Sequence, residues 1–396
     1  TYLILKSDFW LIAFIAISAI SIKNSDSYLI SWFQWVKLLE FTVFYWYLSH
    51  YAFKKFVLFN SFLAIFFGGI FQAIVAIIQF LKQSNMGLKY LGESVINNDF
   101  SGVASFYVSD SEKIIRAYGT TPHPNVLATF LLLSLFAFYS IYLYSRLDKG
   151  EARPEGAARL HSEHPPFADS WDKFFLVSYG VILFGFFTTF SRTVIFIWLL
   201  TFCMGLAVIP IKHNYRIIFG TETGRKRIRA ILLVSFFAIL LFGSLYFHES
   251  IARLTIGAGD QAVELRSFYA KEALKTNINL FGIGYGNFMS WLIKENPFLS
   301  PYAYQPVHNI FLLIYAETGA LGISAFILFL GFLVKDFIVK MNLEKFYHLS
   351  FIFLFIALIF ISFFDHMFWT LQQGRLVFWL SLAVLTFSQK GDTMRI

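Results

Sequence analysis

The chain has almost no cysteine and little charge. Cys203 is the single cysteine among 396 residues, and charged side chains make up 14% of the sequence. One thiol excludes an internal disulfide and a thiolate metal cluster, and because Cys203 lies inside an apolar run we expect it to be a small buried core residue. A soluble domain of this length needs more charge, so the composition excludes that class.

Apolar and aromatic side chains take the place of charge. Hydrophobic residues account for 57% and aromatics for 20% of the sequence, and the mean hydropathy is +0.63. A helix needs roughly 20 apolar residues to cross about 30 Å of hydrocarbon, because every backbone polar group must be satisfied within the segment. Barrel strands would show short polar and apolar alternation instead. We therefore predict an all-α, polytopic transmembrane helical bundle that forms a single integral membrane domain over residues 1–396.

Ten apolar segments carry this prediction, the first of them short and flanked by Lys6 and Asp8. They are residues 8–22, 29–49, 56–81, 126–145, 174–190, 193–211, 230–247, 309–334, 347–364 and 375–388. We find no internal repeat and no separate soluble domain. Because the chain opens on Thr1 and shows no signal peptide, we expect its natural beginning to lie further upstream.

The net charge of +8 is informative about orientation, and we predict no nucleic-acid partner. Lys and Arg gather in alternate connections, which places those connections in the cytoplasm. The basic residues on that side are Lys54, Lys55, Arg146, Lys149, Arg153, Arg159, Lys212, Arg216, Arg225, Lys226, Arg227, Arg229, Lys335, Lys340, Lys345, Lys390 and Arg395. Two polar loops, about 82–124 and 248–308, then face the periplasm, and we predict that they are partly helical. Residues 146–172 are expected to form a flexible cytoplasmic linker.

Metal-binding patterns are weak throughout. His161 and His164 share one spacing in the linker, and Asp110 and Glu112 form an acidic pair without a histidine. Neither supplies a full ligand set. We predict that the protein uses no metal and no cofactor.

A histidine stands where a polar loop becomes an apolar helix. His308 and Asn309 run straight into the apolar residues 310–322. Asn309 can cap that helix, and the positive end of a helix disfavours imidazolium, which keeps His308 neutral and able to act as a general base. The alternative is an interface histidine that hydrogen-bonds a loop carbonyl.

Three arginines on the same side could bind an anion. Arg192 lies in a short turn between two spanning segments, where a charge is costly without a partner or a function. Arg266 lies in a segment, 260–275, whose composition favours a helix with alanines around the arginine. Arg116 could add a third positive charge. Arginine grips phosphate oxygens with two parallel donors, and the alternative for Arg266 is a solvated basic face.

Other polar residues could support such a site. Glu317 is an intramembrane carboxylate for which we favour pairing with an arginine or a role in helix register. Prolines on both sides of His123 give a rigid approach to a helix that Asn125 can cap. Asp365 opens a short outer turn, rich in aromatic and polar groups, that could anchor the chain at the headgroups or bind sugar.

The segment from Phe281 to Phe288 contains three alternating glycines. It resembles a nucleotide-binding loop only superficially, because no buried strand precedes it. We interpret it as a tight turn or as flexible backbone beside a substrate.

Five of these segments occur in the order and spacing of a known family. Residues 116–125, 190–193, 265–275 with 281–288, 306–322 and 365–379 together resemble the O-antigen ligase and polymerase superfamily. The resemblance covers most of the chain from about residue 30. Its most specific parts are the His308-Asn309 helix and the turn from Asp365 to Arg375.

The resemblance implies a multi-pass glycosyltransferase of the GT-C kind in the bacterial inner membrane, with its active site facing the periplasm. Such enzymes transfer a glycan from undecaprenyl diphosphate to an acceptor hydroxyl, here lipid A-core or another glycan, with inversion and without a metal. Members have about twelve spanning helices, so ten would fit a chain that lacks the first two.

The resemblance also implies roles for individual residues. His308 matches the base proposed for the family, and Arg192 and Arg266 match the arginines proposed to hold the diphosphate. Arg116 and Arg375 match the pattern less closely.

Three functions stay open at this point. The first is a ligase, and the second is a polymerase that joins lipid-linked repeat units at the same kind of site. The third is a transporter or flippase of lipid-linked sugars, for which related halves and helices broken at the midplane would be expected. The sequence shows neither feature, which favours an enzyme embedded among membrane lipids.

Overall fold

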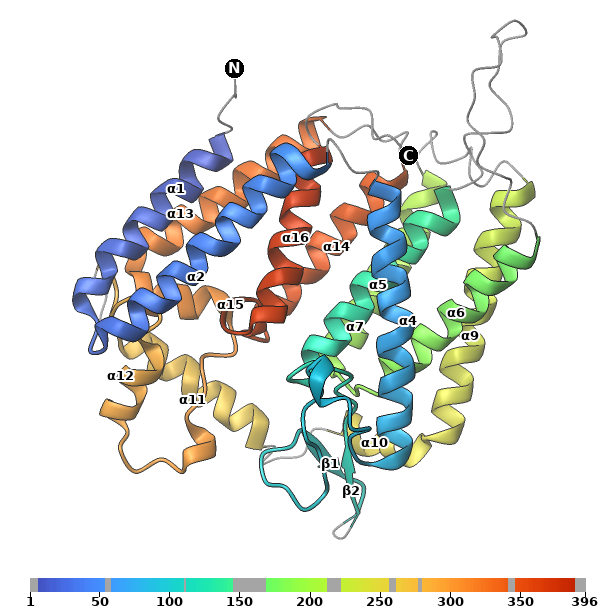
Figure 1. Cartoon of the computed structure of the whole chain (residues 1–396), viewed down its shortest axis with the longest axis horizontal. Coiled ribbons are helices and arrows are strands. Elements are labelled where there is room, and N and C mark those ends of the chain that lie inside the picture. The colour runs from blue at the N-terminus through green and yellow to red at the C-terminus, as the bar shows by residue number, and fades with distance from the viewer. Residues whose placement is uncertain are drawn as a thin grey trace, which may run out of the picture. The chain divides into compact units, whose positions relative to one another are not determined.

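The computed structural model describes residues 6–53, 58–109, 112–144, 169–211, 222–255, 261–276, 280–340 and 346–388. The chain divides into two compact units (Figure 1). The first unit comprises Thr1–Lys55, Ile256–Met341 and Phe355–Met394, and the second comprises Phe56–Thr255, Asn342–Leu354 and Arg395–Ile396. Residues 110, 161 and 164, from the two weak metal patterns, and most of the linker lie outside the described residues.

Each of the ten predicted apolar segments corresponds to a helix in the described part of the chain. The corresponding helices are α1 Lys6–Ser21, α2 Tyr28–Tyr47, α4 Leu58–Lys82, α5 Pro124–Tyr144, α6 Asp169–Phe187, α7 Arg192–Ile211, α9 Glu222–Leu245, α13 Ile310–Lys340, α14 Phe346–Ser362 and α16 Gln372–Ser388. Within the described ranges, five stretches are long and apolar enough to cross a membrane, namely Lys6–Asn24, Phe59–Lys82, Pro124–Leu143, Gly224–Leu245 and Ile310–Val339. The protein is therefore a polytopic, mostly helical membrane protein.

The predicted outer loops contain further short elements. The second loop is partly helical, as predicted, with α10 Phe247–Leu254, α11 Gln261–Lys275 and α12 Phe288–Glu295. The first loop holds an antiparallel pair, β1 Ser105–Tyr107 and β2 Lys113–Ile115, in the register Ser105 to Ile115. The sequence did not predict these strands. A further short helix, α15 Met367–Thr370, lies just before α16.

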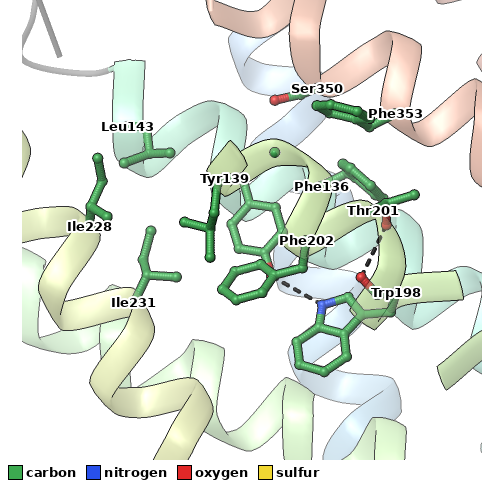
Figure 2. A pocket seen from close by; sticks show the side chains of 12 residues that line it. Phe136, Tyr139, Leu143, Trp198, Thr201, Phe202, Ile228, Ile231, Ser350 and Phe353 are labelled. Carbon is green, nitrogen blue, oxygen red and sulfur yellow. Dashed lines mark hydrogen bonds between the residues drawn. The ribbon is translucent and has the colours of Figure 1, made fainter. Parts of the chain in front are cut away.

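In the second unit, α4 packs against α5 and α6, and α6 packs against α9. Polar side chains in this core satisfy one another: the hydroxyl of Tyr179 hydrogen-bonds the hydroxyls of Tyr139 (3.0 Å) and Ser235 (2.7 Å). Trp198 Nε1 also donates to the Tyr139 hydroxyl, at 3.1 Å (Figure 2). Such closure is required where no water can serve as partner.

Figure 2 shows a small pocket beside this network. Its volume is about 60 Å³, and its walls are aromatic and aliphatic side chains that include Phe136, Phe202 and Ile231. The hydroxyl-bearing residues that line it are Tyr139, Thr201 and Ser350, and no charged side chain lines it. A pocket with these walls offers van der Waals contact and no acid, base or ion partner, so we do not place the chemistry there.

In the first unit, α1 packs along α13, α2 packs against α16, and α16 also contacts α13 and α15. The core is aromatic, with Phe14, Phe326 and Trp369 in mutual ring contact at centroid distances of 5.3–5.9 Å. α11 and α12 both contact α13. In this unit α11 and α12 of the second outer loop therefore pack against α13.

Three sequence expectations are wrong. Cys203 is exposed on α7, because an apolar run does not reveal which of its faces turns outward. The expected continuous helix over 309–334 is interrupted in α13 at Gly319, whose φ of 69° and ψ of −169° are not helical. Asn125 does not cap α5: Pro124 is the first helical residue, and His123 Nδ1 accepts a hydrogen bond from the Asn125 N–H at 3.2 Å.

Candidate functional site

His308 is held at the first turn of α13. Asn309 Oδ1 accepts a hydrogen bond from the Leu312 N–H at 3.0 Å, which is the cap that the sequence predicted. His308 precedes that cap by one residue and is partly buried. The capped start of α13 therefore fixes the position of the His308 backbone.

Two aromatic rings from distant parts of the first unit enclose the imidazole. The His366 ring meets it edge to face, with centroids 4.8 Å apart and planes at 80°. The Tyr269 ring of α11 lies nearly parallel to it, with centroids 5.8 Å apart and planes at 16°. Tyr269 is itself fixed, since its hydroxyl donates to the Ala303 carbonyl at 2.6 Å. The orientation of His308 is therefore set by packing.

These surroundings hold His308 neutral. The pKa of His308 is lowered to about 4, chiefly by burial and also by the positive charges of His366 and Arg266, while Asp365 and a hydrogen bond with the Pro306 backbone oppose the shift. Nδ1 of His308 is buried and makes no hydrogen bond within the described part of the chain. A neutral imidazole with a vacant ring nitrogen can accept a proton.

Arg266 lies on α11, within the helix that the sequence predicted. It is partly buried, and its charge lowers the pKa of both His308 and His366. Ala273, two turns further along the same helix, is fully buried. A guanidinium therefore lies close enough to the two imidazoles to influence them electrostatically, and an anion bound there would do the same with opposite sign.

His366 is a site residue that sequence reasoning did not select. Its Nδ1 forms a 2.6 Å hydrogen bond with Thr370 Oγ1, which also donates to the His366 carbonyl at 3.2 Å. Burial lowers its pKa. The preceding Asp365 accepts from the Met367 N–H at 3.0 Å and so shapes the start of α15. The adjacent Asp365 and His366 in an outer turn were the sequence signal by which His366 could have been identified.

Glu317 has a structural environment, as favoured from the sequence. It is buried in α13. Its carboxyl oxygen accepts from the Phe288 N–H at 3.4 Å, and its carbonyl accepts from the Gly284 N–H at 3.0 Å. The glycine segment is a tight turn, with positive φ at residues 282, 284 and 286. At Gly282 a Cβ would lie 2.5 Å from the Glu317 backbone, so only glycine permits this approach.

Arg375 is tied into the first unit. Its Nε donates to the Trp369 carbonyl, and its Nη2 donates to Gln34 Oε1 at 2.7 Å. It lines a cavity of about 140 Å³ together with Glu317, Trp369 and Thr370. This cavity borders the imidazole pair, because Thr370 holds His366 and Pro306 lies two residues before His308.

The other predicted arginines belong to the second unit. Arg116 is buried, with Nε donating to the Thr189 carbonyl at 2.7 Å and Nη2 to Asn125 Oδ1 at 2.6 Å. Arg192 begins α7, and its Nη1 donates to the Arg253 carbonyl at 3.4 Å. Asn125 Oδ1 also accepts from Ser191 at 2.9 Å, which joins the first outer loop to this turn.

The candidate residues thus form two groups. His308, Asn309, Arg266, Asp365, Glu317 and Arg375 belong to the first unit, and Arg116, His123 and Arg192 to the second. Within the first unit the structure brings His308, His366 and Tyr269 into contact and sets Arg266 near them. Convergence of the second group with His308 stays a prediction.

Comparison with known proteins bears on the resemblance seen in the sequence. Residues 177–327 match the family model described as O-antigen ligase. The matched range includes Arg192, Arg266, His308 and Glu317, so the resemblance is confirmed over that part of the chain. The curated proteins contain no match.

Proposed function

We propose that this membrane protein, with its O-antigen ligase match over residues 177–327, is a glycosyltransferase. It moves a glycan from undecaprenyl diphosphate to an acceptor hydroxyl on the periplasmic face, with lipid A-core as the acceptor. The neutral, packed imidazole of His308 is the observation that carries the proposal. Its position two residues before a candidate membrane span would give it access to both a lipid-borne donor and a water-exposed acceptor.

The chemistry is a single displacement at the anomeric carbon. The acceptor oxygen attacks that carbon as its proton passes to His308, and the bond from the carbon to the diphosphate oxygen breaks. Attack from the face opposite the leaving group predicts inversion. Arg266 would stabilise the charge that grows on the departing diphosphate, in the role that a divalent metal fills elsewhere. The resemblance alone supports giving Arg192 and Arg116 the same task.

Donor binding would also strengthen the base. An imidazole with a pKa of about 4 is neutral but weakly basic. A diphosphate beside Arg266 would offset the positive charge that lowers this pKa, so the pKa of His308 would rise as the donor binds. The free enzyme would keep its base unprotonated, and the donor complex would make it more effective.

The broken helix does not favour the transporter alternative. The carbonyls freed near Gly319 accept hydrogen bonds from the glycine turn, from Ile283 N–H to Ala316 at 2.9 Å and from Gly284 N–H to Glu317 at 3.0 Å. Backbone that coordinates a transported ion would instead face a cavity. Here hydrogen bonds within the protein engage the carbonyls of Ala316 and Glu317.

The test is reconstitution of the purified chain with a lipid-diphosphate oligosaccharide, in EDTA, with lipid A-core or a second lipid-linked repeat unit as acceptor. We expect transfer to lipid A-core that persists in EDTA and falls roughly 10²–10⁴-fold in His308→Ala. His248→Ala is the matched control, because His248 is exposed on α10. Transfer only to the second repeat unit would identify a polymerase, and translocation without transfer would contradict an enzyme.

A further inference from the structure

We propose that the 140 Å³ cavity of the first unit binds one neutral sugar residue of the glycan substrates. This inference rests on the proposed function and adds to it the place where a sugar is held. The residues that carry the argument are Gln34, Tyr285, Glu317, Trp369, Thr370 and Arg375, all of which line the cavity. They come from α2, the glycine turn, α13, α15 and α16.

The cavity lies beside the imidazole pair. Thr370 is part of its wall, and Thr370 Oγ1 holds His366 Nδ1 at 2.6 Å. His366 in turn packs against His308. A sugar in the cavity would therefore lie one side chain away from the pair that contains the proposed base, which is where a reacting glycan must be oriented.

Trp369 offers a hydrogen-bond donor without a well-aligned partner. Its side chain is 4% exposed, and Nε1 interacts with the nearby Glu317 carboxyl group but meets no acceptor with good hydrogen-bond geometry within the described part of the chain. A buried donor without a well-aligned partner is unfavourable. A ligand that accepts a hydrogen bond in this cavity would remove that cost.

Gln34 offers a second donor. Arginine can only donate, so the 2.7 Å contact from Arg375 Nη2 identifies the Gln34 atom on that side as the amide oxygen. The amide nitrogen then points away from Arg375, and its two N–H groups make no hydrogen bond to the described chain. Two contacts fix the Gln34 side chain. One is the hydrogen bond from Arg375, and the other is the close approach of Gly286, where an added Cβ would lie 2.7 Å from Gln34 Cγ.

The remaining wall groups suit a sugar rather than a phosphate. Glu317 contributes carboxyl oxygens, which can accept hydrogen bonds from sugar hydroxyls. Arg375 already donates to Trp369 and Gln34 and supplies a nearby opposite charge for Glu317. This arrangement favours a supporting role for Arg375 over the diphosphate contact predicted from the sequence.

Aromatic rings complete the cavity. Tyr285 meets Trp369 edge to face, with centroids 6.0 Å apart. A pyranose has apolar C–H faces and polar hydroxyl edges, so it matches walls that combine aromatic surface with separate donors and acceptors. A volume of about 140 Å³ also exceeds the roughly 10–15 Å³ that one water needs. The cavity therefore has room for a group larger than solvent.

Saturation-transfer NMR on the full chain in lipid nanodiscs tests this, with the methyl glycosides of glucose, galactose and N-acetylglucosamine as probes. We expect at least one probe to bind, and its affinity to fall roughly fivefold in Trp369→Phe, which removes the N–H and keeps the aromatic wall. Gln34→Glu keeps the acceptor for Arg375 and removes both donors, so it should have a similar effect. Trp379→Phe is the matched control, since Trp379 is buried on α16 outside the cavity wall.

Several results would overturn the sugar site. They are the absence of binding by all three glycosides, equal affinity in Trp369→Phe and Trp379→Phe, and displacement of the glycoside by inorganic pyrophosphate. In the transfer assay, a rise of KM for the lipid-linked donor in Trp369→Phe would identify the bound residue as the donor's, and a rise of KM for the acceptor would identify it as the acceptor's.

The two proposals can fail separately. Transfer that depends on His308, without glycoside binding that depends on Trp369, would remove the sugar site and leave the enzyme. Glycoside binding that depends on Trp369, in a protein that transfers nothing, would retain the site and reject the proposed reaction.

Discussion

The imidazoles of His308 and His366 meet edge to face, with centroids 4.8 Å apart, although 57 residues separate them in the sequence. Two positive charges at this distance would repel strongly in a partly dry setting. Simultaneous protonation of both rings is therefore unfavourable, and the pKa of His308 depends on the presence of His366.

The first prediction concerns pH. Since the pKa of His308 is lowered from 6.5 to about 4, its neutral form persists above pH 4 and is lost as the pH falls through that value. We expect kcat/KM for transfer to lack the roughly tenfold fall between pH 7 and 5.5 that an ordinary histidine base would impose. In His366→Phe, which removes one charge that lowers the pKa, the acid limb should move to higher pH. His248→Phe should leave the profile unchanged, and so should His366→Phe if the pair has no electrostatic coupling.

The second prediction concerns Arg266. Arg266→Lys keeps the positive charge but loses the two parallel donors that match phosphate oxygens. We expect kcat/KM for the lipid-linked donor to fall roughly 10–100-fold. Lys271→Arg, at an exposed position of the same helix, is the control and should have wild-type rates. Full activity of Arg266→Lys would refute a bidentate grip.

The third prediction separates two roles for Arg116. Its bonds to the Thr189 carbonyl and to Asn125 Oδ1 tie the first outer loop to the α6–α7 turn. We expect Arg116→Lys to destabilise the fold by about 1–3 kcal/mol, because the buried Thr189 carbonyl loses its guanidinium donor, with little change in donor KM. A variant of normal thermal stability with a raised donor KM would instead support the diphosphate role inferred from the family resemblance.

The fourth prediction compares two glycines by thermal unfolding. Gly282 has a φ of 68°, and an added Cβ would lie 2.5 Å from the Glu317 backbone, so Gly282→Ala should lower the unfolding temperature, with strain of at least about 1–3 kcal/mol. Gly243 lies inside α9 with nothing within 4 Å of an added Cβ. Gly243→Ala should stabilise the helix by about 0.5–1 kcal/mol. Equal effects would show that the glycine turn is not docked on α13.

Local features were predictable from the sequence. The ten helices follow from apolar length, and Asn309 caps α13 because a cap needs only residues next to the helix end. The same reasoning failed at Asn125, since Pro124 occupies the first helical position and the preceding His123 supplies the acceptor. Neighbouring residues compete for one cap, and the sequence alone did not rank them.

Features that depend on distant contacts were not predictable. His366 joins the site because α13 and α15 are brought together, and no local pattern marks that contact. The break at Gly319 depends on the arrival of the turn at residues 280–284. The exposure of Cys203 depends on which face of α7 packs inward. In each case the information lies in the tertiary fold.

The break at Gly319 also bears on how the protein is synthesised. The glycine turn is synthesised before α13. The N–H groups of Ile283 and Gly284 therefore emerge before the carbonyls of α13 that accept their hydrogen bonds. α13 in turn cannot keep an interrupted backbone in hydrocarbon without those donors. Insertion of this helix and closure of the loop before it must therefore finish as one event. A nascent chain stalled between residues 288 and 310 would expose the N–H donors of the glycine turn, without their acceptors on α13, to the quality-control machinery of the membrane.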